Sequence, residues 1–246
     1  MKLATEKLKI KLFADGANKA DMLTMYRNPA ISGFTTNPTL MKKAGITDYR
    51  TFAFDILACI PDRSISFEVF ADEFDEMEKQ AHEIASWGKN VAVKIPVMNT
   101  EAQFTGSLIK KLSYAGITLN VTAIMTLDQV MDVADSLSPE TPAIVSVFAG
   151  RIADTGIDPM PLMREARQIL AKLPKAELLW ASPRELLNVF QADEVGCHII
   201  TATNDILNKL SLVGKDLELF SLETVKMFYN DAMKAGFSLD VAEETV

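Results

Sequence analysis

The sequence predicts an α/β fold: a single (β/α)8 barrel, the TIM barrel, followed by a C-terminal helix. Two observations lead to this prediction. Short apolar, β-branched runs alternate with amphipathic helical patterns along the whole chain. The chain has 246 residues, close to the ~250 that such a barrel uses as one domain. Eight strand–helix units of this size close into a parallel barrel more readily than they form an open sheet.

Eight runs have the composition of strands. Several are apolar without interruption, which is typical of parallel strands covered on both faces. In chain order they are 11–15 (KLFAD), 32–36 (SGFTT), 65–70 (ISFEVF), 91–97 (VAVKIPV), 117–124 (ITLNVTAI), 143–150 (AIVSVFAG), 177–182 (ELLWAS) and 198–203 (HIITAT).

Amphipathic helices are predicted between these strands. The clearest are residues 71–87, 127–137, 160–173 and 222–235. Gly236 follows the last one, where a glycine often ends a helix. Pro183 stands where a further helix would have its first position. No linker-like segment, low-complexity run or internal repeat divides the chain. We therefore expect one barrel domain over 1–246, with 221–236 as a C-terminal helix.

Composition narrows the class of function. The net charge of −8 argues against a broad nucleic-acid surface. The chain contains neither a signal-peptide layout nor the ~20 consecutive apolar residues of a membrane span, so we expect a cytoplasmic protein without a membrane partner. Two dispersed cysteines and two histidines offer little material for a metal site, and none is expected.

Polar residues gather near the C-terminal ends of the predicted strands, which form the active-site face of a barrel. Because unpaired polar groups are costly to bury, we expect these residues to satisfy one another and to line a wet pocket. They are Asp15, Thr35, Thr36, Asn37, Glu68, Lys94, Asn120, Thr122, Ser146, Arg151, Ser182 and Arg184.

Lys94, inside VAVKIPV, has two interpretations. In the first, it has a structural role, either on an edge strand or in a pair with Glu68. In the second, burial leaves part of its amine neutral, so that it attacks a carbonyl and forms an imine. Glu68 would then exchange protons with the imine, and Asp15 is a candidate base for cleavage of the neighbouring carbon–carbon bond. Arg151 and Arg184 follow late strands, where barrels often bind phosphate; each could equally be a surface residue.

Five runs resemble the transaldolase family in order and approximate spacing, over nearly the whole chain. They are GFTTNPTL (33–40), VAVKIPV (91–97), LNVTAIMT (119–126), VSVFAGRI (145–152) and WASPRE (180–185). The resemblance implies a barrel enzyme that transfers a dihydroxyacetone unit between sugar phosphates. It also implies a lysine Schiff base and no metal or organic cofactor.

The resemblance also implies a role for each matching residue. Lys94 falls on the imine-forming position, and Asp15 on the acid/base of bond cleavage. Glu68 and Thr122 fall on the pair that holds a catalytic water. The substrate-binding positions are Asn37, Asn120 and Ser146 for sugar hydroxyls, with Thr35 beside them, and Arg151, Ser182 and Arg184 for phosphate.

Alternatives remain within and outside this family. Its fructose 6-phosphate aldolases carry Gln at the position of Glu68 and Tyr at that of Phe148, so Glu68 with Phe148 favours transfer over simple cleavage. Pro183 replaces a residue that is usually aromatic, which leaves open another anionic ketose, such as a sulfonated sugar. Compact members often form pentamers or decamers through the C-terminal helix and longer members dimers, so a homo-oligomer is expected. An inactive barrel used as a binding module is the remaining hypothesis.

Overall fold

A computed structural model describes residues 8–239, so the ends of the predicted domain, 1–7 and 240–246, lie outside the described residues. Eight parallel strands close into a barrel in which each strand pairs with its neighbours in chain order, and the last pairs with the first. This confirms the predicted (β/α)8 barrel. The strands are β1 (Lys11–Asp15), β2 (Ile31–Thr35), β3 (Ser64–Glu68), β4 (Val91–Pro96), β5 (Leu119–Ile124), β6 (Ala143–Val147), β7 (Ala176–Trp180) and β8 (Ile199–Thr203).

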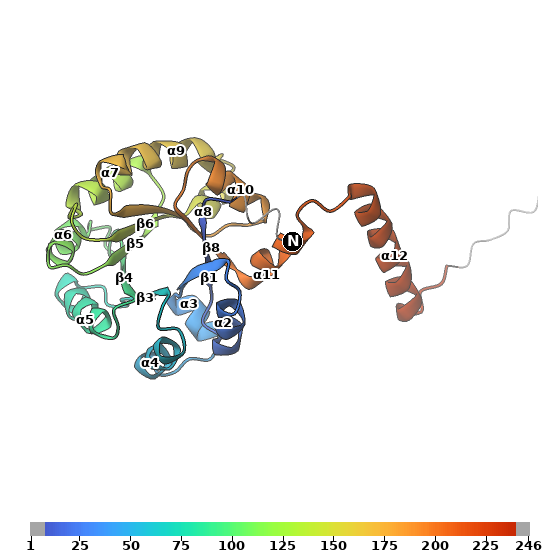
Figure 1. Ribbon diagram of the computed structural model, residues 1–246, viewed down its shortest axis with the longest axis horizontal. Helices are drawn as coiled ribbons and strands as arrows, with labels where there is room; N and C mark the ends of the chain where they lie inside the picture. Colours follow the sequence, from blue (N-terminus) through green and yellow to red (C-terminus); the bar gives the residue numbers. More distant parts are fainter. Residues whose placement is uncertain (1–7, 240–246) are drawn as a thin grey trace, which may run out of the picture.

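The helices of residues 8–239, except the last, form an outer layer around the strands (Figure 1). The helices, with the last included, are α2 (Lys19–Tyr26), α3 (Pro38–Lys43), α4 (Tyr49–Cys59), α5 (Phe74–Ser86), α6 (Gly106–Tyr114), α7 (Leu127–Ser136), α8 (Ala149–Asp154), α9 (Pro159–Ile169), α10 (Leu187–Glu194), α11 (Asn204–Asn208) and α12 (Leu217–Ala235). Short 3-10 turns follow α9 at Leu170–Lys172 and α11 at Lys209–Leu212.

The predicted helix start at Pro183 is wrong, because α10 begins at Leu187. The side-chain oxygen of Asn188 accepts hydrogen bonds from the backbone N–H groups of Arg184 and Glu185, at 2.8 and 3.2 Å. These donors are thus satisfied in a loop, which continues past the proline before the helix forms. The loop matters for the site, because it carries residues at the end of β7.

The strands separate two apolar cores. The larger lies between the barrel and its helices, and a smaller one fills the barrel interior with Phe13, Ala92, Ile144, Leu179, Ala181 and Ile199. Phe13 occupies the space that Gly33 leaves free, since a Cβ on Gly33 would lie 2.5 Å from the Phe13 ring. The interior is therefore packed with apolar side chains, and any ligand site must lie nearer an end of the barrel.

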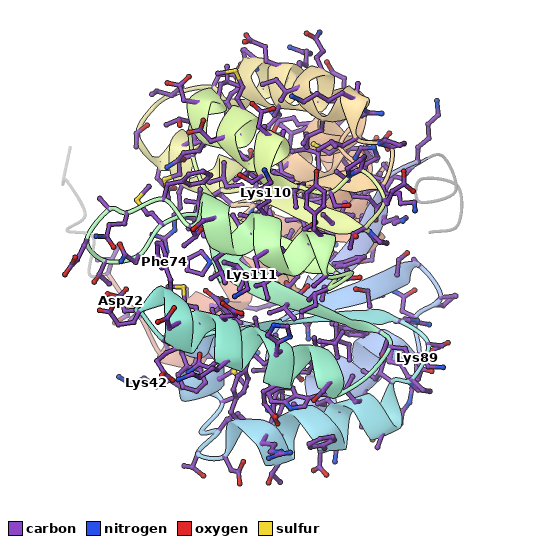
Figure 2. The ribbon with its side chains drawn as sticks, turned by 90° about the vertical axis from the view of Figure 1, so that its left-hand side faces the viewer. Lys42, Asp72, Phe74, Lys89, Lys110 and Lys111 are labelled. Atoms are coloured by element: carbon purple, nitrogen blue, oxygen red, sulfur yellow. The ribbon has the colours of Figure 1, made fainter. Side chains whose placement is uncertain are left out.

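Figure 2 shows the two ends of the barrel from the side of α5 and α6, which lie next to each other. An ion pair of 2.7 Å between Lys111 of α6 and Glu78 of α5 joins the two helices. Asp72 and Phe74, just after β3, mark the end where the strands finish, and Lys89, just before β4, marks the opposite end.

The last helix differs from the others. Helix α12 extends away from the barrel (Figure 1), and none of its residues is buried. It starts earlier than predicted because Asp216 caps it, with a side-chain oxygen that accepts from the N–H of Leu219 at 2.8 Å. Gly236, with φ +70°, ends it as predicted. Among residues 8–239, no helix is long and apolar enough to cross a membrane.

Candidate active site

One pocket of about 470 Å³ lies at the C-terminal ends of the strands, within the size range of small-molecule sites. It is lined by Phe148 and by all the polar residues that we expected in a wet pocket except Thr36 and Arg184. These are Asp15, Thr35, Asn37, Glu68, Lys94, Asn120, Thr122, Ser146, Phe148, Arg151 and Ser182. Pro38, Thr39, Leu40, Ala123, Leu179, Ala181 and Thr201 complete the lining. The pocket lies at the end at which barrels of this class carry their sites.

Strand register brings the central residues together. Glu68, Lys94 and Asn120 are aligned on the neighbouring strands β3, β4 and β5. Aligned residues of parallel strands point to the same face, and residues two apart along a strand do so as well. Thr122 therefore points to the same face as Asn120, one row nearer the end of the barrel. The alternation of apolar and polar residues in these strands is thus what builds the polar end of the interior.

Lys94 is 7% exposed and makes two polar contacts. Its Nζ lies 2.9 Å from a carboxylate oxygen of Glu68 and donates to the backbone carbonyl of Thr36, also at 2.9 Å. Since β4 lies between β3 and β5, the edge-strand interpretation of this lysine is wrong. The pair with Glu68 lies inside the pocket, where a ligand carbonyl can reach the amine.

Asp15 ends β1 on the same pocket. The Thr35 hydroxyl donates to its Oδ1 at 2.7 Å. Burial raises the pKa of this carboxyl above its ordinary value and the charge of Glu68 adds to the rise, while Lys94 and the Thr35 hydrogen bond oppose it. A carboxyl whose pKa is raised by burial is suited to exchanging a proton with a ligand.

Asn120 and Ser146 form part of a buried hydrogen-bonded row. Ser146 donates to the Oδ1 of Asn120 at 2.6 Å, and the Nδ2 of Asn120 donates to the hydroxyl of Ser66 at 3.0 Å. In this arrangement, the Asn120 side-chain oxygen faces Ser146 and its amide nitrogen faces Ser66. One amide hydrogen of Asn120 is not used in this row and can serve a ligand oxygen.

Thr122 is buried, yet its hydroxyl has no hydrogen-bond partner among the residues described. A buried hydroxyl without a partner costs free energy, so a water or ligand at this position would be stabilised. The next residue, Ala123, has φ +63°, and the pairing of β5 with β6 is irregular there. Such strained positions in residues other than glycine often occur at functional sites.

We call the part of the pocket that Arg151 and Ser182 line its basic side. Arg151 of α8 lines it, with its guanidinium 5.7 Å from the centre of the Phe148 ring. Ser182 lines it from the loop after β7, with φ +57°. Arg184 points elsewhere, because its guanidinium is held at two positions by the carboxylate of Asp154, with Nε 2.9 Å from Oδ1. Arg151 is thus the arginine that faces the pocket.

Asn37 reaches the pocket from the start of α3. Its side-chain oxygen caps that helix by accepting from the N–H of Leu40 at 2.9 Å. The oxygen is therefore occupied, and the amide nitrogen is the group left for a ligand. Capping holds the side chain in place without a ligand, which favours an ordered site.

Two buried polar residues of this region were not among the predicted site residues. Thr201 of β8 lines the pocket and contacts Thr35, and Ser66 of β3 holds Asn120. The sequence contained a signal for both residues. Ser66 lies two residues before Glu68, on the same face of its strand, and Thr201 is a polar residue inside the apolar run HIITAT. Within 8–239, no group of three or more His, Cys, Asp or Glu side chains could hold a metal ion.

Comparison with known proteins identifies the family of this chain. The family described as transaldolase/fructose-6-phosphate aldolase matches residues 12–246. A probable transaldolase of Dehalococcoides mccartyi is 34% identical over 202 residues, which cover 82% of this chain and 90% of the relative. A probable transaldolase 2 of Listeria monocytogenes is 33% identical over 217 residues, with 86% and 94% covered.

Solved structures show the same architecture at low identity. A 2,3-dimethylmalate lyase aligns with TM-score 0.55 and 13% identity, over 99% of this chain and 89% of that one. A 3-keto-L-gulonate-6-phosphate decarboxylase from Vibrio cholerae aligns with TM-score 0.52 and 15% identity, over 80% and 88%. These two similarities concern the fold alone. The match over residues 12–246 and the identity to curated relatives show that this chain belongs to the transaldolase/fructose-6-phosphate aldolase family of enzymes.

Proposed function

We propose that this protein is a cytoplasmic transaldolase that moves a dihydroxyacetone unit from a ketose phosphate, such as fructose 6-phosphate or sedoheptulose 7-phosphate, to an aldose phosphate. The observation that carries the proposal is the buried contact of 2.9 Å between Lys94 and Glu68, inside a pocket that Asp15 also lines. The proposed nucleophile, proton carrier and second acid/base therefore line one cavity of sugar size.

In the first step, the Lys94 amine adds to the ketose carbonyl and forms a carbinolamine. Loss of water then gives the imine, and this step requires a proton for the departing hydroxyl. Glu68 supports the assignment because it is close enough to Nζ to exchange that proton directly or through one water. The unpartnered hydroxyl of Thr122 offers this water a hydrogen-bonding position on the same pocket.

In the second step, Asp15 takes the proton of the hydroxyl on the carbon next to the dihydroxyacetone unit. The carbon–carbon bond breaks, its electron pair moves into the imine, and the aldose phosphate leaves. The raised pKa of Asp15 supports this role, because the group must gain and lose a proton in each cycle. The enamine then attacks the acceptor aldehyde, Asp15 returns the proton, and water hydrolyses the new imine.

The remaining lining residues support a polyhydroxylated, anionic substrate. Donor and acceptor groups of Asn37, Asn120, Ser146 and Thr35 suit sugar hydroxyls. We assign the anion to Arg151 and Ser182, with Arg184 joining when it exchanges Asp154 for the substrate. A sulfonate presents similar oxygens, so a sulfonated ketose is an alternative substrate for the same groups.

Phe148 favours transfer over release of free dihydroxyacetone. Release requires protonation of the enamine carbon, and a phenyl ring next to the pocket can neither donate a proton nor hold a water for it. The enamine is therefore expected to persist until an aldehyde acceptor binds. An aldolase is the second candidate function, because the matching family includes aldolases.

The decisive experiment traps the imine. The protein is incubated with fructose 6-phosphate, reduced with borohydride, digested and mapped by mass spectrometry. We expect an adduct of the size of dihydroxyacetone on Lys94, which would demonstrate both imine and cleavage. Lys94→Met should lose the adduct. The matched control, Lys89→Met, should keep it, because Lys89 is exposed at the opposite end of the barrel (Figure 2).

Other outcomes are also informative. An adduct that retains the whole sugar phosphate would support the imine but contradict cleavage of this ketose. Absence of an adduct with phosphorylated and sulfonated ketoses alike, in a folded protein, would reject the Schiff-base mechanism in favour of a binding module.

We also propose that α12 makes the protein a homo-oligomer. Leu222, Val225, Tyr229 and Met233 follow one another at steps of three or four residues, so they share one side of the helix. All four are exposed on this chain. A second copy of the chain is the proposed occupant of this apolar side, since every copy presents the same helix.

A further inference from the structure

Thr201 lies on β8, the strand that closes the barrel against β1, and is 6% exposed. Its hydroxyl oxygen is 2.5 Å from that of Thr35, which in turn donates to Asp15 at 2.7 Å. Three strands therefore contribute to one chain of hydrogen bonds that ends on the carboxylate. No part of the mechanism above uses Thr201.

The direction of this chain follows from counting hydrogens. Thr35 has a single hydroxyl hydrogen, and it is used in the bond to Asp15. Thr35 must then accept from Thr201, so the order of donation is Thr201 to Thr35 to Asp15. In this direction each hydroxyl hydrogen of the chain has an acceptor, and the ionised carboxylate receives the last one.

The opposite direction is less favourable. If Asp15 were protonated and donated to Thr35, the Thr35 hydrogen would point to Thr201. The hydroxyl hydrogen of Thr201 would then need an acceptor, and Thr35 is the hydrogen-bond partner that its side chain has among residues 8–239. A buried hydroxyl without an acceptor costs free energy. The series of hydrogen bonds from Thr201 through Thr35 therefore favours the ionised carboxylate of Asp15.

We infer that Thr201 is a positioning residue that acts through Thr35 to hold Asp15 ionised and oriented as the base of carbon–carbon cleavage. This inference rests on the proposed function for its kinetic test. Loss of the Thr201 hydroxyl should leave Thr35 free to rotate and to accept as readily as it donates. Asp15 would then bind its proton at a higher pH.

The charged surroundings of Asp15 do not change with this substitution. Lys94 of β4 and Glu68 of β3 face it across the active-site pocket. On its other side, Asp21 of α2, Lys43 of α3 and Asp205 of α11 line a neighbouring cavity that Asp15 also borders. Since all these groups remain in place, a change in the pH profile reports the loss of the hydroxyl.

The test compares kcat/KM against pH for the full-length wild type, Thr201→Val and Thr201→Ser, with fructose 6-phosphate as donor and an aldose phosphate as acceptor. We expect Thr201→Val to move the acid limb to higher pH by about half a unit to one unit, the size expected for one hydrogen bond. The plateau at high pH should change by less than ~2-fold, since Asp15 is ionised there in both proteins. Thr201→Ser, which keeps the hydroxyl, should restore the wild-type limb.

Thr203→Val is the matched control. Thr203 lies on the same strand, aligned with Asp15, and lines the neighbouring cavity rather than the active-site pocket. An unchanged acid limb in Thr201→Val, or an equal shift in Thr203→Val, would overturn the inference. If Thr201→Val failed to fold, Thr201→Ala, which adds no volume, would replace it.

Failure of the inference can be separated from failure of the proposed function. If the wild type trapped no ketose, the proposed function would fail. Carbon-13 NMR of aspartate-labelled wild type and Thr201→Val, with Asp15→Asn to assign the signal, would still follow the titration of Asp15. A higher midpoint in Thr201→Val supports the role of Thr201, and equal midpoints reject it.

Discussion

The backbone at Gly150 approaches the carbonyl oxygen of Ser182 so closely that a Cβ on residue 150 would lie 1.5 Å from it. The N–H of Gly150 also donates to the carbonyl of Ala181 at 3.3 Å. These contacts join the start of α8 to the loop after β7. Arg151 and Ser182, which line the basic side of the pocket, are therefore held together by a backbone contact that only glycine permits.

Gly150→Ala should separate these two segments, because a methyl group cannot occupy the position of a backbone oxygen. A backbone shift that costs about 1–3 kcal/mol would displace Arg151, so we expect KM for a phosphorylated ketose to rise by ~10-fold or more. Steady-state kinetics measure the effect, with Ala153→Ser on the exposed side of the same helix as control. Equal KM values in a folded Gly150→Ala protein would contradict the role of this contact.

Arg151 and Arg184 should contribute unequally to binding of the anion. Arg151 faces the pocket, whereas Arg184 must first give up its two contacts with Asp154. Loss of a charge-assisted hydrogen bond costs about 1.5–3 kcal/mol, so Arg151→Gln should raise KM by ~10- to 100-fold. Arg184→Gln should raise it less. Titration with inorganic phosphate gives an independent comparison, and a larger effect at Arg184 would contradict the assignment.

Much of this architecture could be predicted from the sequence because strand periodicity is local. All eight strands were predicted from apolar runs, and the polar row of Glu68, Lys94 and Asn120 followed from their places in those runs. Thr201 was missed although its strand was correct. A threonine in a strand is ordinary by composition, and its contact with Thr35 depends on closure of the barrel.

The errors arose where side chains decide local structure. The helix expected at Pro183 begins at Leu187, because Asn188 satisfies the backbone donors of the preceding loop. The bond between Arg184 and Asp154 joins the loop after β7 to the end of α8, so no spacing in the sequence indicates it. Such contacts depend on tertiary geometry, which a motif does not contain.

Phe148→Tyr should move the enzyme from transfer towards cleavage. The added hydroxyl would lie beside the pocket, where it can hold a water or donate a proton to the enamine. With fructose 6-phosphate and no acceptor, we expect free dihydroxyacetone to form faster than with wild type, and the transfer rate to fall. The matched control is Phe148→Leu, which changes the ring without adding a hydroxyl; an equal rise in that variant would contradict the explanation.

His198 should make the barrel sensitive to acid. Its Nδ1 accepts from the backbone N–H of Leu178 at 2.8 Å, a bond that needs the neutral ring. Burial lowers the pKa of His198, with Arg167 and Lys11 acting in the same direction and Glu177 against it. Because the pKa is lower in the folded state, the stabilisation is present above the ordinary histidine pKa of ~6.5 and is lost as pH falls below it.

His198→Asn tests this sign, since the Asn side-chain oxygen can accept the same bond without titrating. Between pH 7.5 and 5, the wild type should lose more of its Tm than the variant does. Titratable groups that the two proteins share affect both Tm values equally, so they cancel when the two changes in Tm are compared. A parallel loss of Tm in the two proteins would show that His198 does not contribute to acid sensitivity.

The apolar side of α12 leads to a prediction about assembly. Val225 and Tyr229 lie four residues apart on that side, and no residue of the helix is buried against its own barrel. A glutamate at either position would place a charge in a contact that otherwise buries apolar area. Because each copy of the chain carries the substitution, both sides of the contact would bury a charge.

Light scattering after size exclusion should therefore show an oligomer for wild type and smaller species for Val225→Glu and Tyr229→Glu. Asp231→Lys, which changes the charge at an exposed position on the opposite side of the helix, should keep the wild-type mass. A monomeric wild type would reject the proposed assembly, and an oligomer that survives both substitutions would place the contact on another surface of the barrel.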